Sequence, residues 1–384
     1  MKPMEYGKIT DEAIAAFKKR VGMQLRVSHQ FNEEATRETI RKFADGIGDS
    51  NPLWHNSNDA ADSPYKRLVA PPSWLASVFP TWILQGLPGV HAIHAGTEWE
   101  FYRPVMAGDT IRPESYFTGY EIKKCQFGGK TIVEHQEARY YNQKDQLVGI
   151  ARPAGFRMER EAMVELNQQG DITLPHPWTE SELEKIEEDV LNEKERGSLP
   201  LFWEDVNEGD QLPVITKGPL GITDMIAYCI GASPIAIKAH GSSLKEYKRH
   251  PDWCFRDSLT YSLEPIYSVH YNQSAASACG LPYPYDLGTQ RHCWLMQLLT
   301  NWMGDYGWIK TCNAKYTGFV YFSDAIRLSG EVTNKFIGDD GELLVEVKTA
   351  CINQRGKNVM PGLSVIELPS CRDKNQVINK KLID

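Results

Sequence analysis

Two loops in this chain carry the residue types that proton-transfer chemistry needs, and an apolar segment follows each of them. In the second loop and the segment after it, six residues stand out by type: Glu264, His270, Asn272, Asp286, Gly288 and Arg291. A histidine and a carboxylate can act as general base and general acid. A glycine amide at the start of a helix can hold a polarised carbonyl or an anion. The segment 264–291 is therefore the first candidate for a functional site.

The first loop offers a similar set of residues. Asp49, Trp54 and His55 lie in the stretch GDSNPLWHNSNDA, which opens a long segment dense in Gly, Asn, Asp, Ser and Pro. A loop of this length inside a compact domain is usually functional or disordered. Its two tryptophans and interspersed apolar residues favour an ordered, functional loop.

Each candidate also has a purely structural alternative. Asp49 could cap a loop and Asp286 a helix, and Glu264 could be a surface carboxylate. His55 and His270 could be hydrogen-bonded structural histidines, which is how we interpret His91 and His94 at the start of a strand. Arg291 could form an ion pair in the core or contact a ligand, and the sequence does not choose between the two.

Helical periodicity predicts the elements that position these residues. The apolar run Trp294, Leu295, Leu298, Leu299, Trp302 and Met303 has helical spacing and few polar interruptions, which predicts a buried helix over 289–304. The counterpart after the first loop is 74–86, where Pro80 predicts a kinked or short helix. Earlier helices are expected in residues 8–22 and 32–44, and from His91 the pattern becomes that of antiparallel strands.

Length and composition suit a soluble, cytoplasmic protein of two domains. The chain has 384 residues, 41% of them apolar, and a net charge of −8, which argues against nucleic acid or an anionic membrane as the main partner. The N-terminus lacks the apolar core of a signal peptide, and no apolar run of 18 residues occurs. The eight cysteines are scattered without a CxxC pair, as expected for free thiols in a reducing cytoplasm.

The second half of the chain repeats the plan of the first. Four matches recur in the same order: His55 with Ala60-Ala61 and His270 with Ala275-Ala276, Trp74-Leu75 and Trp294-Leu295, Gly108–Arg112 and Ser323–Arg327, and Asn142-Gln143 and Asn353-Gln354. Four matches in order indicate a tandem duplication. We expect an N-terminal domain at 1–160, an acidic helical linker at 161–200 with a capping box at Thr179 and Glu182, and a C-terminal domain at 201–384.

These residues resemble the MaoC-like, or hydratase 2, family in its double-hotdog form, with an N-terminal FAS1-like dehydratase domain. GDSNPLWHNSNDA is similar to the family's G-D-x-N-P-x-H-x-D loop, and GTEWEFYRPVMAGDTIRPESYF and YDLGTQRHCWLMQLLTNWMGDYGW carry the rest of the resemblance. It implies an α+β fold in which a long helix is wrapped by an antiparallel sheet, twice per chain. It also implies hydration or dehydration of an acyl-CoA, in fatty acid or in aromatic or steroid side-chain catabolism.

The chain departs from the family pattern in both loops. Asp49 and His55 are separated by five residues where the family has four, so that Trp54 stands in the usual place of the histidine. Aligning the halves through the shared Ala pair puts Glu264 opposite Asp49 and His270 opposite His55. Asn272 then stands where the family often has an aspartate.

The two halves differ in the residues that lead into their central helices. The first is reached through Val69-Ala70-Pro71-Pro72, and proline has no N–H to donate. The second is reached through Asp286-Leu287-Gly288-Thr289, where Gly288 can bring its amide close to a ligand. We therefore predict that the second half carries the oxyanion site, while the shortened first helix leaves room for a bulky acyl group.

The predicted function is that of an enoyl-CoA hydratase or 3-hydroxyacyl-CoA dehydratase with His270 as base and a nearby carboxylate as acid. Two alternatives stay open, a hotdog acyl-CoA thioesterase and a non-catalytic acyl-CoA-binding subunit. No metal motif, P-loop or dinucleotide-binding GxGxxG is found, so no cofactor is implied. The expected partners are the acyl-CoA and further copies of the chain, as a homodimer or higher homo-oligomer.

Overall fold

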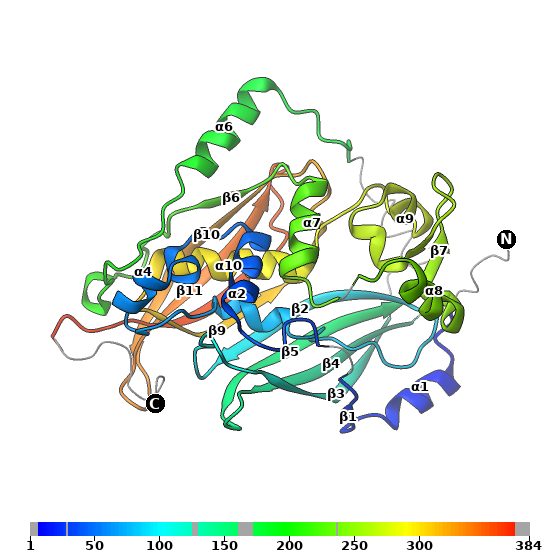
Figure 1. Cartoon of the computed structure of the whole chain (residues 1–384), viewed down its shortest axis with the longest axis horizontal. Helices are drawn as coiled ribbons and strands as arrows, with labels where there is room; N and C mark the ends of the chain where they lie inside the picture. Colours follow the sequence, from blue (N-terminus) through cyan, green and yellow to red (C-terminus); the bar gives the residue numbers. More distant parts are fainter. Residues whose placement is uncertain (1–6, 28–29, 125–129, 160–171, 236, 373–384) are drawn as a thin grey trace.

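A single antiparallel sheet of ten strands runs through the whole molecule. The computed structural model describes residues 7–27, 30–124, 130–159, 172–235 and 237–372. The strand order is β1-β3-β4-β5-β2-β9-β12-β11-β10-β6, so the strands of the first half fill one end and those of the second half the other (Figure 1). The two halves meet where β2 pairs with β9, from Gly96 opposite Lys315 to Glu100 opposite Thr311.

The two halves place their strands in mirrored order, as a duplication requires. The strands of the first half are β1 (Gln24–Leu25), β2 (His91–Phe101), β3 (Arg112–Lys124), β4 (Lys130–Tyr141) and β5 (Leu147–Met158). Those of the second half are β6 (Ile215–Lys217), β9 (Trp308–Lys315), β10 (Ile326–Ile337), β11 (Leu343–Asn353) and β12 (Gly362–Glu367). A separate hairpin pairs β7 (Cys254–Arg256) with β8 (Leu263–Pro265).

The helices connect and cover this sheet. In the first half they are α1 (Asp11–Lys18), α2 (Arg37–Ile47), α3 (Pro52–His55), α4 (Ser57–Asp62) and the 3₁₀ helix η1 (Pro72–Ser77). Then come α6 (Glu180–Leu191), η2 (Trp203–Asp205), α7 (Ile222–Gly231), α8 (His240–Arg249), η3 (Pro251–Trp253), η4 (Ile266–His270), α9 (Gln273–Ala278) and α10 (Gly288–Met303). The capping box expected at Thr179 and Glu182 is present at the start of α6.

Helix α10 is the buried centre of the second half, which confirms the helix expected at 289–304. All of its residues from Gln290 to Thr300 are buried, together with Trp302 and Met303. Its polar residues bond within the core, where Trp294 Nε1 donates to the carbonyl of Ile47 at 2.9 Å and Gln297 to that of Gly48 at 3.1 Å. Because both acceptors end α2, these bonds tie the central helix of the second half to the first loop.

The corresponding helix of the first half is much shorter than the predicted range 74–86. Only Pro72–Ser77 is helical, with 3₁₀ geometry, and an irregular segment follows from Pro80. Proline cannot donate the backbone hydrogen bond that would continue a helix and clashes with the preceding turn. The expectation of a short helix at Pro80 is therefore confirmed, and the predicted end at Gly86 is wrong.

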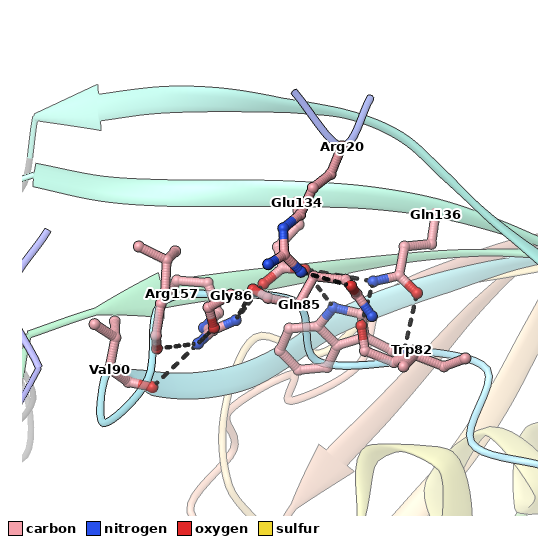
Figure 2. A network of polar contacts seen from close by, with 10 residues as sticks. Arg20, Trp82, Gln85, Gly86, Val90, Glu134, Gln136 and Arg157 are labelled. Carbon is pink, nitrogen blue, oxygen red and sulfur yellow. Dashed lines mark hydrogen bonds and ion pairs between the residues drawn. The ribbon is translucent and has the colours of Figure 1, made fainter. Parts of the chain in front are cut away.

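The irregular segment is fastened to the sheet by a buried ion pair (Figure 2). Arg157 and Glu134 are 3% and 0% exposed and lie 2.7 Å apart. Arg157 also donates to the carbonyl of Leu87 at 2.8 Å, and Glu134 accepts a hydrogen bond from Trp82 Nε1 at 3.2 Å. Trp82 packs so closely on β5 that a Cβ at Gly155 would lie 2.0 Å from its ring. The irregular segment thus covers the part of the sheet that the rest of the predicted helix was expected to cover.

The duplication extends to individual hydrogen bonds. Asp109 accepts from the amide of Met106 at 2.8 Å, and Asp324 accepts from that of Tyr321 at 3.0 Å. The other carboxylate oxygen of each aspartate accepts from a glutamine, Gln143 in the first half and Gln354 in the second. Two of the predicted matches are therefore the same turn, built twice. The fold is a double hotdog of the α+β class.

Candidate functional site

His270 ends η4 and is held by the backbone just before α10. Its Nδ1 donates to the carbonyl of Tyr285 at 2.9 Å, and its ring lies edge-on to those of Tyr267 and Tyr285, with centroids 5.1 and 4.6 Å away. Burial lowers the pKa of His270 to about 4, against the opposing effect of the Tyr285 and Asp286 backbone. The imidazole is therefore neutral at pH 7, and with Nδ1 protonated its Nε2 is the basic nitrogen.

The start of α10 presents backbone donors three to five residues after Tyr285. Leu287 is the N-cap residue and makes no side-chain cap. Among the described contacts, the amides of Gly288, Thr289 and Gln290 have no acceptor, as is usual in the first turn of a helix. These donors carry the positive end of the helix dipole. A neutral imidazole is thus bonded to the chain three residues before a helix end whose free amides are suited to hold an anion.

Gly288 is required here by packing. A Cβ on this residue would lie 2.4 Å from the ring of Tyr316. Tyr316 is fixed in turn, because its hydroxyl is 3.0 Å from His292 Nδ1 and its ring packs edge-on against His94. The sequence analysis selected Gly288 because a glycine can bring its amide close to a ligand. The structure adds that a larger residue at this position would clash with Tyr316.

Replacing Gly288 with alanine is therefore expected to displace the helix start. We expect turnover to fall by about 10²–10³-fold, the usual cost of losing an oxyanion donor, and the free energy of unfolding to fall by about 1–3 kcal/mol from overpacking. Gly241→Ala in α8 is the matched control, since a Cβ there meets nothing within 4 Å. Steady-state kinetics and urea unfolding of both variants check this, and equal behaviour of the two would contradict it.

Asp286 and Arg291 form an ion pair in the core. Asp286 Oδ2 lies 2.5 Å from Arg291 Nε, and the side chains are 0% and 3% exposed. Arg291 also donates to the carbonyl of Val359 at 3.0 Å, and Asp286 accepts from the amide of Val320 at 3.3 Å. Burial raises the pKa of Asp286 to about 6, although Arg291 opposes this. Of the two alternatives for Arg291, the structure shows the core ion pair.

Glu264 and Asn272 lie on either side of His270 in sequence, and the two residues have different surroundings. Glu264 is on β8, accepts from Ser262 Oγ at 2.7 Å and lines an open hollow of about 470 Å³ together with Tyr271. Asn272 caps α9 and donates to Asp257 at 2.9 Å. Among the described residues no hydrogen bond joins Glu264 to His270. Its role as the acid stays a prediction.

In the first loop, Trp54 is the side-chain hydrogen-bond partner of Asp49, in the place where the family has a histidine. Its Nε1 donates to Asp49 Oδ2 at 3.0 Å, and the amide of Asn51 donates to Oδ1 at 3.1 Å. His55 instead donates through Nε2 to the backbone carbonyl of Asp49 at 2.7 Å. Asp49 is 3% exposed, and burial raises its pKa. An indole only donates, so the first loop offers Asp49 no basic partner of the kind that His270 supplies.

Hydrogen bonds place the two loops in a different register from the one inferred from the Ala pairs. Asn56 and Asn272 both cap a six-residue helix, so His270 corresponds to Trp54 and not to His55. The amide of Asp49 donates to Ala44, and that of Ser233 donates to Tyr228, at the same spacing. Ser233 Oγ accepts from Ile235 as Asp49 accepts from Asn51. The residue opposite Asp49 is therefore Ser233, and the alignment of Glu264 with Asp49 is wrong.

In this register Asp49 corresponds to Ser233 and His270 to Trp54, so neither loop has both an aspartate and a histidine at these two positions. Four residues around His270 escaped the sequence interpretation: Tyr228, Ser233, Tyr267 and Thr289. Tyr228 Oη is 2.9 Å from Thr289 Oγ1, and Ser233 Oγ is 2.7 Å from Tyr267 Oη. For Ser233 the sequence held one signal, the stretch Gly231-Ala232-Ser233-Pro234 at the end of α7, which weakly resembles the first loop. The insertion that follows it hides this similarity.

His292 is another buried histidine, in the second turn of α10. It is 2% exposed, and burial lowers its pKa to about 3. A histidine with a lowered folded pKa contributes stability that is present above pH 6.5 and lost as the pH falls toward the folded value. We expect His292→Gln to reduce the loss of stability between pH 7 and pH 5 by about 1–2 kcal/mol relative to the unsubstituted protein. Urea unfolding at both pH values measures this, and an unchanged difference would contradict it.

The described residues contain neither a metal-binding cluster nor a membrane-spanning helix. No group of three or more His, Cys, Asp or Glu side chains in that part of the chain could hold a metal ion. No helix there is long and apolar enough to cross a membrane.

Known proteins resemble both the first half and the whole fold. Residues 20–150 match the family model of the FAS1-like, dehydratase domain region. A UPF0336 protein from Parafrankia sp. is 35% identical over 82 residues, covering 20% of this chain and 54% of that protein, and one from Thermobifida fusca is 30% identical over 92 residues, covering 20% and 56%. The chain thus spans about half the length of the curated relatives it matches.

Solved structures match the chain over most of its length at low identity, which shows the fold. A MaoC-like dehydratase superposes with a TM-score of 0.60 at 16% identity, covering 92% of this chain and 99% of that one. A putative MaoC domain protein dehydratase from Chloroflexus aurantiacus gives 0.55 at 13% identity, covering 91% and 96%. The chain therefore has the double-hotdog fold of these MaoC-like dehydratase structures, and residues 20–150 in its first half resemble the FAS1-like dehydratase domain region.

Proposed function

We propose that the chain hydrates enoyl thioesters, or dehydrates 3-hydroxyacyl thioesters, at the start of α10, with acyl-CoA as the substrate. The observation that carries the proposal is the neutral imidazole of His270, bonded to Tyr285 three residues before the unpaired amides of Gly288, Thr289 and Gln290. Hydration needs a base for water and donors for the enolate-like oxygen. His270 Nε2 is the proposed base, and the amides are the proposed donors.

In the hydration direction His270 Nε2 removes a proton from water as its oxygen bonds to C3. Negative charge develops on the thioester oxygen, where the amides and the helix dipole stabilise it. Protonation at C2 completes the reaction. Because the pKa of His270 is lowered to about 4, the base stays active well below pH 6.5.

The proposal includes a bulky acyl group, because the first central helix is short and could leave room for one. The enclosed space beside Trp54 and Pro72 measures about 20 Å³, room for about one water molecule. A long acyl tail would therefore have to displace the segment after Pro80 or extend into the open hollow beside Tyr271.

A binding subunit without activity is the second candidate, and one observation favours it. Neither half keeps both the aspartate and the histidine of the family loop, since Trp54 and Ser233 replace one member each. A thioesterase would use the same carbonyl site but release free thiol. Domain limits at 160 and 200 and assembly into a homo-oligomer stay predictions.

Incubation with enoyl-CoA thioesters of graded chain length separates these functions. Loss of the enoyl absorbance with formation of a 3-hydroxyacyl product, and without free thiol, is the expected result. Free CoA without a hydroxyacyl product would overturn the proposal in favour of hydrolysis. Tight binding without either product would identify a binding subunit.

A further inference from the structure

The proton donor for C2 is the missing part of the proposed site. In the register set by the hydrogen bonds, Ser233 stands where the first loop has Asp49, and a serine hydroxyl does not replace a carboxylic acid in proton transfer. The described part of the chain nevertheless contains a hydroxyl in contact with Ser233. Tyr267 Oη lies 2.7 Å from Ser233 Oγ and 3.8 Å from Cys229 Sγ.

We propose that the phenol of Tyr267, positioned by Ser233, is the acid partner of His270, an inference that rests on the proposed function. Tyr267 and His270 are both in η4, and their rings meet edge-on with centroids 5.1 Å apart. A single turn of chain thus brings the two rings into contact. Ser233, which is 0% exposed, fixes the phenol from the end of α7.

The environment keeps the phenol protonated, as a donor must be. Burial raises the pKa of Tyr267 well above 10, and the neighbouring Cys229 adds to this while Ser233 opposes it. The carbon atom to be protonated is a far stronger base than a phenolate, so the transfer runs toward C2. A tyrosine is one of the side chains that act as general acids in enzymes.

The step balances without a further reactant. His270 takes a proton from water while the water oxygen bonds to C3, and the π electrons of the C2–C3 bond move onto the thioester. The electron pair returns to C2, which takes the proton of the Tyr267 hydroxyl. The imidazolium then returns its proton to the phenolate, directly or through solvent, which restores the enzyme. Dehydration follows the same steps in reverse.

Tyr267→Phe tests the inference because it removes one oxygen and keeps the ring. We expect kcat to fall by about 10²–10³-fold with little change in KM. Ser233→Ala, which leaves the phenol in place but unsupported, is expected to reduce kcat less, by about 10-fold. Tyr261→Phe is the matched control, since this tyrosine is 74% exposed in the turn between β7 and β8.

An isotope effect distinguishes the chemical role from a structural one. In dehydration of a 3-hydroxyacyl-CoA deuterated at C2, we expect Tyr267→Phe to increase the isotope effect, because C2 proton transfer becomes slower. Full turnover by Tyr267→Phe while His270→Ala is inactive would overturn this inference and leave the proposed function standing. A reduced kcat with an unchanged isotope effect would also overturn it. Absence of hydroxyacyl product from the unsubstituted protein would overturn both.

Discussion

His270→Ala is expected to lower kcat for hydration by about 10²–10⁴-fold, the range usual for loss of a general base. The variant keeps the amides at the start of α10, so substrate binding and KM should change much less than kcat. The expected loss follows from the position of His270. Its Nδ1 donates to the Tyr285 carbonyl, which leaves Nε2 as the basic nitrogen. Initial rates with an enoyl-CoA, measured over a range of concentrations, give both constants.

His55→Ala is the matched control for this prediction. His55 belongs to the corresponding loop of the first half, but it bonds only to the Asp49 carbonyl and lies 4.0 Å from the exposed Asp45. We expect its kcat to stay within about twofold of the unsubstituted protein. Loss of activity in His55→Ala with full activity in His270→Ala would move the site to the first half.

Arg291→Met is expected to reduce the free energy of unfolding by about 3–5 kcal/mol at pH 7. Removing one partner of a buried ion pair leaves an uncompensated charge, and Asp286 is 0% exposed. Burial already raises the pKa of Asp286 to about 6, and loss of Arg291 raises it further. A carboxyl with a raised folded pKa destabilises the fold as the pH rises through that value, so the deficit should shrink at pH 5. Urea unfolding at the two pH values measures both effects.

Arg327→Met provides the control for the loss of an arginine. Arg327 is 43% exposed and pairs with Asp189 at 3.0 Å on the surface, where such pairs are worth about 0–1 kcal/mol. The double variant Asp286→Leu with Arg291→Met should recover much of the stability, because no buried charge remains. An Arg291→Met variant as stable as Arg327→Met would contradict the assignment of this pair to the core.

The sequence was informative where local pattern controls structure. Helix α10 follows from the spacing of its apolar residues, and the paired turns at Asp109 and Asp324 follow from the repeated residues themselves. The length of η1 was harder to predict, because residues 81–90 keep an apolar pattern although Pro80 ends the helix. What holds them is the buried pair of Arg157 and Glu134, which lie far away in sequence.

The candidate site was predictable only in part for the same reason. His270 and Gly288 are identified by their own loop and helix, whereas Ser233 comes before an insertion that contains α8 and the β7–β8 hairpin. Without contacts, the Ala pairs were the best guide to register, and they set His270 opposite His55. The helix caps at Asn56 and Asn272 move that correspondence by one residue, which changes the partner to Trp54.

The most direct test of the central claim, that the thioester binds at the start of α10, is amide hydrogen exchange with and without a saturated acyl-CoA. The amides of Gly288, Thr289 and Gln290 have no acceptor among the described contacts, so a bound carbonyl should slow their exchange. We predict slower exchange in peptides covering 285–291 and unchanged exchange in those covering 69–77. Protection of 69–77 with none at 285–291 would contradict the claim.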